Sequence, residues 1–183
     1  MVFKKQISLT VLVTALLTYP ISAVASKELG EVKATVDSSK SSGRKALDSK
    51  AIKQIEAVLL ANEKLHASFF EFDPAKISSA AKSVGAAIGK IEVPELKKLL
   101  SFSKSKLEAM TADKSKDELN KDYHLVSMAL IHIIKNFDVG DTYNAFSCPM
   151  VKMKWVQNTS KLAKVQNPYA SNMKQCGSQD TKF

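Results

Sequence analysis

Each of the two cysteines in this chain has a methionine close by, and together they form the clearest chemical pattern in the sequence. Met150 follows Cys148 by two positions, and Met173 precedes Cys176 by three. Two thiolates with two thioethers would make a soft site that suits Cu(I) better than harder ions. The four side chains are therefore a candidate copper(I) site.

A disulfide is the other use of the same cysteines. Cys148 and Cys176 lie 28 positions apart and are the only two in the chain. An even number of cysteines in an exported protein is typical of a disulfide, and closing a loop of this size would stabilise the fold by about 3–4 kcal/mol. Both uses stay open, since a pair that is oxidised without metal can bind metal when it is reduced.

Three further possible ligands recur at every fourth position. His124, Met128 and His132 share one stripe if their segment is helical. Their imidazole and thioether groups could complete a soft-metal site. Three-residue patterns also arise by chance in helices, so an accidental spacing is the competing explanation.

The sequence carries none of the common catalytic motifs. It has no serine nucleophile elbow, no Gly-rich phosphate loop, no His-Glu-x-x-His pattern and no Cys-x-x-Cys pair. Its acidic residues are scattered among lysines rather than paired. We therefore expect a protein that is not an enzyme.

The charge is strongly basic but consists almost entirely of lysine. There are 27 Lys+Arg against 18 Asp+Glu, for a net charge of +9, and Arg44 is the only arginine. Nucleic-acid sites rely on the bidentate contacts of arginine, whereas lysines spread along helices are typical of a solvated face. Nucleic-acid binding is therefore not expected.

The N-terminus has the organisation of a signal peptide, which we place at residues 1–25. Two lysines precede an apolar stretch at residues 7–17, and the pattern Ala23-x-Ala25 fits a cleavage site. No later apolar run is long enough to cross a bilayer. We expect a periplasmic or secreted protein with no integral membrane segment after cleavage.

Four segments of helical character follow a Ser/Lys/Gly-rich flexible linker at residues 26–46. In each segment apolar residues recur at intervals of three or four, the period of an amphipathic helix. Asp73-Pro74 and a capping box at Ser115–Glu118 mark two of the helix starts. The short connections predict an antiparallel four-helix bundle over residues 47–139. The predicted helices span residues 48–72, 74–91, 94–110 and 116–137.

The periodicity is lost over residues 140–178. Pro and Asn punctuate this segment, so we expect turns, short extended pieces and a brief helix near residues 171–175. The fourth helix is apolar nearly all round, which indicates that this segment packs on its back. The expected fold class is therefore all-α, an antiparallel four-helix bundle. An irregular C-terminal segment of the same domain packs on the fourth helix, and residues 179–183 form a tail. The expected anchors of the segment are Trp155, Asn167, Pro168 and Tyr169.

His66 lies at a core-type position of the first predicted helix. Leu59, Asn62 and Phe69 are its neighbours along the apolar face. A histidine in such surroundings is more often hydrogen-bonded in the core than a metal ligand. We expect Asn62 to be its partner or to set the register of the helix.

The C-terminal motifs resemble those of an uncharacterised bacterial helical domain family, which is found in exported proteins and in periplasmic adaptor proteins of copper- and silver-type efflux systems. Its signature is an aromatic run into Cys-Pro-Met, then a Trp, then Asn-Pro-Tyr and Met-x-x-Cys-Gly. The resemblance is close over residues 143–177 and looser over residues 48–178. It implies a role near metal transport, with efflux components or another metal-handling protein as partners. The residues that carry it are Tyr143, Phe146, Cys148-Pro149-Met150, Trp155, Asn167-Pro168-Tyr169, Met173 and Cys176-Gly177.

Two functions follow from these observations. The first is an exported, soft-metal (copper-type) binding or metal-handling accessory protein, with Cys148, Met150, Met173 and Cys176 as ligands of copper(I). The alternative is a non-catalytic structural or protein-interaction domain, whose C-terminal segment is pinned by a Cys148–Cys176 disulfide.

Overall fold

The computed structural model describes residues 43–183. These residues form four helices followed by a three-stranded antiparallel sheet, and none of these helices has the length and apolar character needed to span a membrane. The predicted signal peptide and most of the predicted linker lie outside this part of the chain. The elements are α1 (Ser49–Ser68), α2 (Pro74–Ile88), α3 (Pro94–Glu108), α4 (Lys116–Asn136), β1 (Tyr143–Cys148), β2 (Met153–Asn158) and β3 (Ser178–Gln179).

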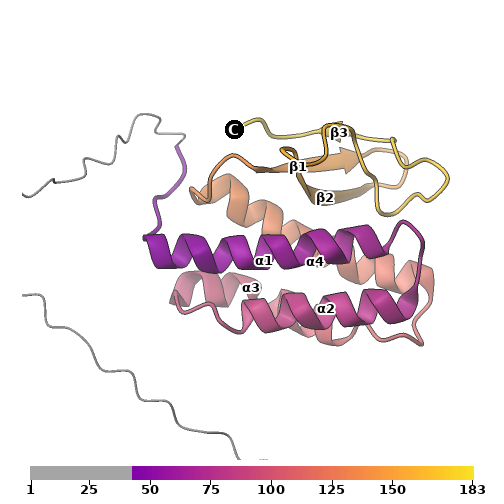
Figure 1. Cartoon of the computed structure of the whole chain (residues 1–183), viewed down its shortest axis with the longest axis horizontal. Coiled ribbons are helices and arrows are strands. Elements are labelled where there is room, and N and C mark those ends of the chain that lie inside the picture. Colours follow the sequence, from indigo (N-terminus) through magenta and orange to yellow (C-terminus); the bar gives the residue numbers. More distant parts are fainter. Residues whose placement is uncertain (1–42) are drawn as a thin grey trace, which may run out of the picture. The chain divides into compact units, whose positions relative to one another are not determined.

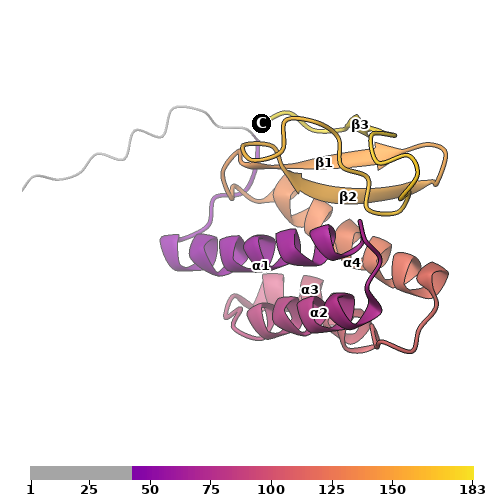
Figure 2. The same cartoon turned by 45° about the vertical axis from the view of Figure 1, so that its right-hand side comes forward.

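The elements stack in three layers, which Figures 1 and 2 show from two directions. α2 and α3 form the outer helical layer, α1 and α4 form the middle layer, and the sheet covers the other side of the middle layer. α4 is therefore covered on two sides, and Tyr123, Val126 and Leu130 are fully buried along it. The C-terminal residues do pack on α4, although Leu125 on its outer side stays 38% exposed.

The predicted all-α fold class is wrong in the C-terminal part of the chain. Residues 140–183 contain a sheet of strand order β2-β1-β3 rather than an irregular segment. β1 is buried at every residue except Ser147, so the apolar/polar alternation of a half-exposed strand is missing from its sequence. β3 has only two residues and pairs with a strand about thirty positions earlier. No local sequence pattern predicts such a pairing.

Local capping explains where three of the helices begin. The carboxylate of Asp48 accepts a hydrogen bond from Ala51 N at 2.7 Å, and that of Asp73 accepts from the second and third residues of α2, which starts with Pro74. At α4 the predicted capping box is present, with Ser115 and Glu118 bonded to each other's backbone N–H. These starts are local in sequence, which is why they were predictable.

Both ends of the described chain are tied to the domain. Lys45 N donates to Asn136 O at 2.7 Å, so the segment assigned to the linker already contacts the end of α4 at this residue. In the predicted tail, Gln179 belongs to β3 and Thr181 Oγ1 accepts from Ala145 N at 2.9 Å. The ordered sheet therefore extends beyond residue 178.

Candidate functional site

The two cysteines form a disulfide. Cys148 ends β1 and is buried, and Cys176 lies in the loop that leads into β3. Their Cα atoms are 5.9 Å apart, inside the usual range for a disulfide. The bond thus joins the central strand of the sheet to the C-terminal loop, 28 residues later in the sequence.

Hydrogen bonds within the C-terminal loop bring Cys176 to this position. The buried side chain of Asn167 donates to Cys176 O at 3.0 Å, and its Oδ1 accepts from Tyr169 N at 2.9 Å. Cys176 N in turn donates to Met173 O at 2.8 Å. The Asn-Pro-Tyr motif therefore shapes the loop that presents the second cysteine.

The four residues proposed as anchors are all buried. Trp155 stacks on Phe146, its partner across the β1–β2 ladder, with ring centroids 5.8 Å apart, and meets the ring of Tyr169 edge-on at 6.2 Å. Tyr169 OH donates to Lys154 O at 2.8 Å. Asn167 and Pro168 are buried beside them. The motif and the tryptophan thus form one packed layer between the loop, the sheet and α4.

Gly177 fits this layer because it has no side chain. Its φ of +135° is outside the range that other residues normally adopt, and a Cβ there would lie 2.7 Å from Ser147 O and 2.8 Å from the Trp155 ring. We expect Gly177→Ala to lower the free energy of unfolding by about 2 kcal/mol. Urea unfolding would measure this change. Gly140→Ala is the matched control, since it shares a positive φ but has no atom within 4 Å of a Cβ, and an equal loss in both variants would contradict the role of close packing.

The four sulfur ligands proposed for copper(I) differ in their surroundings. The two cysteine sulfurs are bonded to each other, Met150 is 68% exposed beyond the end of β1, and Met173 is 36% exposed in the loop. With the disulfide closed, neither cysteine offers the thiolate of the proposed four-sulfur site. The two cysteines can therefore act as ligands only after reduction.

Part of the proposed helical stripe does lie beside the disulfide. His124 and Met128 on α4 line a hollow of about 470 Å³ together with Cys148 and Met153. Met153 was not proposed as a ligand, and its place opposite Cys148 in the β1–β2 ladder is what brings it here. His132 is not part of this hollow and is exposed.

His124 is tied to the backbone of β2 through one ring nitrogen. Its Nδ1 lies 3.1 Å from Lys154 N, from which it accepts in one tautomer, and 3.4 Å from Lys154 O, to which it donates in the other. His132 Nδ1 similarly lies 3.4 Å from the Asn136 amide nitrogen, an available donor. No group of three or more His, Cys, Asp or Glu suited to a metal occurs within residues 43–183.

A polar cluster between α1 and the sheet was not anticipated. The carboxylate of Glu63 accepts from Tyr143 OH at 2.5 Å, Asn158 Nδ2 at 2.7 Å and Lys161 Nζ at 2.7 Å. Burial favours a higher pKa for Glu63, but these three donors outweigh it and lower the pKa. The cluster joins residues 80 to 98 positions apart, so no local pattern could have revealed it.

His66 lies next to this cluster and is a buried neutral histidine. Its Nε2 is 2.8 Å from Gln166 O, to which it donates, and the side chain is only 3% exposed. Burial lowers its pKa to about 4. The expected partner was Asn62, but the bond is made to the C-terminal loop. Asn62 Oδ1 instead lies in the core with no hydrogen-bond partner in the described residues.

Comparison with models of protein families, with curated proteins and with solved structures finds no match for this chain. The resemblance of its C-terminal motifs to a family of exported helical domains stays a prediction.

Proposed function

We propose that this protein is a non-catalytic interaction domain whose C-terminal loop is fastened to the sheet by the Cys148–Cys176 disulfide. One observation carries the proposal: the two thiols of the chain, its most reactive side chains, are both used in a bond between the sheet and the loop that covers it. This use is structural, since it closes a segment with little regular structure of its own.

The titratable groups near the sheet are likewise engaged in structure. Glu63 is held by three donors, and His66 is buried, neutral and bonded to Gln166 O. A general base needs a free lone pair within reach of a substrate proton. Three donors occupy the Glu63 carboxylate, and burial leaves the His66 ring only 3% exposed, which favours binding over catalysis.

The disulfide also supports export. Disulfides form and persist in oxidising compartments such as the periplasm and the extracellular space. We propose that the protein works there, in agreement with the signal-peptide pattern of residues 1–25, which lies outside the described residues.

Soft-metal handling is a second candidate, favoured by the hollow beside the disulfide. Cys148 shares that hollow with Met128, Met153 and His124. After reduction, a Cys148 thiolate and two thioethers would face one space, a donor set that suits Cu(I). Partners would then be efflux components or another metal-handling protein.

Native mass spectrometry separates the two functions. The protein would be purified anaerobically, and limiting copper(I) would be added before and after reduction. For an interaction domain we expect the protein before reduction to be two hydrogens lighter than the dithiol form. We also expect it to retain no copper, either before or after reduction. A reduced species with one copper per chain, lost when both cysteines are replaced by serine, would overturn this function and establish metal handling.

A further inference from the structure

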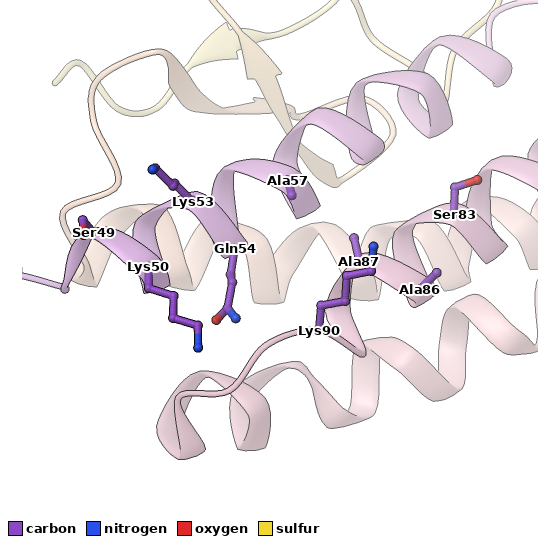
Figure 3. A pocket seen from close by; sticks show the side chains of 9 residues that line it. All are labelled: Ser49, Lys50, Lys53, Gln54, Ala57, Ser83, Ala86, Ala87 and Lys90. Atoms are coloured by element: carbon purple, nitrogen blue, oxygen red, sulfur yellow. The ribbon is translucent and has the colours of Figure 1, made fainter.

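The outer face of the α1–α2 pair carries a long groove. A hollow of about 770 Å³ lies between the two helices at the start of α1, and a second of about 650 Å³ lies farther along the same pair. Ser83 lines both, so the two hollows meet. In Figure 3, Lys50, Gln54 and Lys90 extend into the space between the helices, and Ala57, Ala86 and Ala87 lie along it.

α1 contributes a regular stripe to this groove. Lys53 and Ala57 line the first hollow, Lys64 and Ala67 line the second, and the two pairs lie two helical turns apart on one face of α1. Alanines thus accompany the lysines along this wall, and their small side chains let another helix approach closely.

α2 contributes a matching stripe on the other side. Lys76, Ser79, Ser83, Ala86 and Lys90 follow at intervals of three and four residues, with Lys90 just past the helix end. Between its two lysines the stripe has only small side chains, which let a third helix approach closely. Both walls thus combine a small or apolar centre with lysines at their ends or along their edge.

The charge of the groove is one-sided. Five lysines line the two hollows, against one acidic residue, Glu71. Lys50 is paired with Glu92 at 2.6 Å, and Lys76 lies 3.6 Å from Asp73 and 3.8 Å from Glu71, which leaves Lys53, Lys64 and Lys90 to set the charge of the groove.

We propose that the α1–α2 groove binds an acidic amphipathic helix of a partner protein. The proposal rests on the interaction function above and names the chemistry of its partner. The small and apolar centre receives the apolar face of that helix, and acidic side chains along its flanks pair with Lys53, Lys64 and Lys90. A second copy of this chain is a poor occupant, because it would place lysines against lysines in a protein of net charge +9.

A pair of synthetic peptides tests the groove. The probe is a fluorescent helix of about three heptads with Leu and Ala on one face and Glu on both flanks. The matched control peptide carries Lys in place of Glu. We expect saturable binding of the acidic peptide to the purified protein by fluorescence anisotropy, and none of the basic one. No binding of the acidic peptide up to ~1 mM, or equal binding of both peptides, would overturn the proposal.

Charge-reversal variants test whether the acidic peptide binds in the groove. Lys53→Glu with Lys90→Glu should weaken binding of the acidic peptide about tenfold, whereas Lys97→Glu with Lys135→Glu, the same change on exposed lysines of α3 and α4, should weaken it less than about twofold. Equal losses would mean attraction to net charge alone and would rule out the groove. If the first pair lowers the melting temperature, Lys53→Gln with Lys90→Gln replaces it.

Two further measurements show which part of the groove proposal a negative result would contradict. Ala57→Asp, which places a carboxylate in the lining of the first hollow, should abolish peptide binding, and unchanged binding would show that the centre of the groove is not used. Sedimentation velocity that shows a dimer lost in the same variant would make a second copy the occupant and overturn the acidic partner. Failure of the groove would leave the interaction function standing, because that function is judged independently by whether the reduced protein retains copper.

Discussion

Replacing Cys148 and Cys176 with alanine is expected to lower the free energy of unfolding by about 3–4 kcal/mol. The bond closes a loop of 28 residues that includes the β1–β2 turn, β2 and the irregular chain after it. Without the bond, the conformational entropy of the unfolded chain rises while that of the folded loop changes little, so unfolding becomes more favourable. Urea unfolding would measure the loss, and the melting temperature should fall by about 10 °C.

The single variants provide the control for this prediction. Because either replacement breaks the bond, Cys148→Ala and Cys176→Ala should each lose nearly as much as the double variant. Reductant should destabilise the natural protein and leave the double variant unchanged. A loss below about 1 kcal/mol would contradict a structural role for the disulfide. Hydrogen exchange should locate the loosening in residues 159–179, with the amides of α2 and α3 little affected.

Acidification from pH 6.5 to pH 4 is expected to lower the free energy of unfolding by about 3 kcal/mol through His66 alone. In the folded protein burial lowers the pKa of this histidine from 6.5 to about 4. Between these values the unfolded chain binds a proton that the folded protein excludes. Stability is therefore unaffected by His66 above pH 6.5, falls as the pH drops through this window, and levels off below about pH 4.

Comparison with His66→Gln isolates this contribution. Glutamine can still donate to Gln166 O but does not titrate, so the variant should lose the slope between about pH 6.5 and pH 5. His132→Gln, an exposed position, should keep it. Glu63, whose pKa is lowered in the fold, adds a further loss only below its ordinary pKa of 4.5. Equal slopes in the natural protein and in His66→Gln would show that His66 does not control the acid response.

The helical half of the fold could be read from local patterns. Amphipathic spacing places apolar residues on one face within a turn or two, and caps such as Asp48, Asp73 and the Ser115–Glu118 box act within three residues. Such signals need no knowledge of distant residues. The four helices therefore appear near their predicted positions, whereas the C-terminal sheet does not.

The sheet was missed because its signals are not local. β1 is buried on both sides, between α4 and the C-terminal loop, and so lacks alternation. β3 is a strand only because its two residues pair with Ser147 and Phe146 of β1. The same applies to the partner of His66, which is Gln166, 100 positions away, rather than Asn62 in its own helix.

Sequence alone determined the helical elements, the basic lysine-rich surface and the two possible uses of the cysteines. Only the tertiary structure showed that Cys148 and Cys176 are bonded to each other, because whether they meet depends on how the chain between them folds. It also decided that His124 and Met128 lie beside the disulfide while Met150 points into solvent. Spacing in a sequence limits which residues share a helix face, but contacts between separate elements are set by the packing of the whole domain.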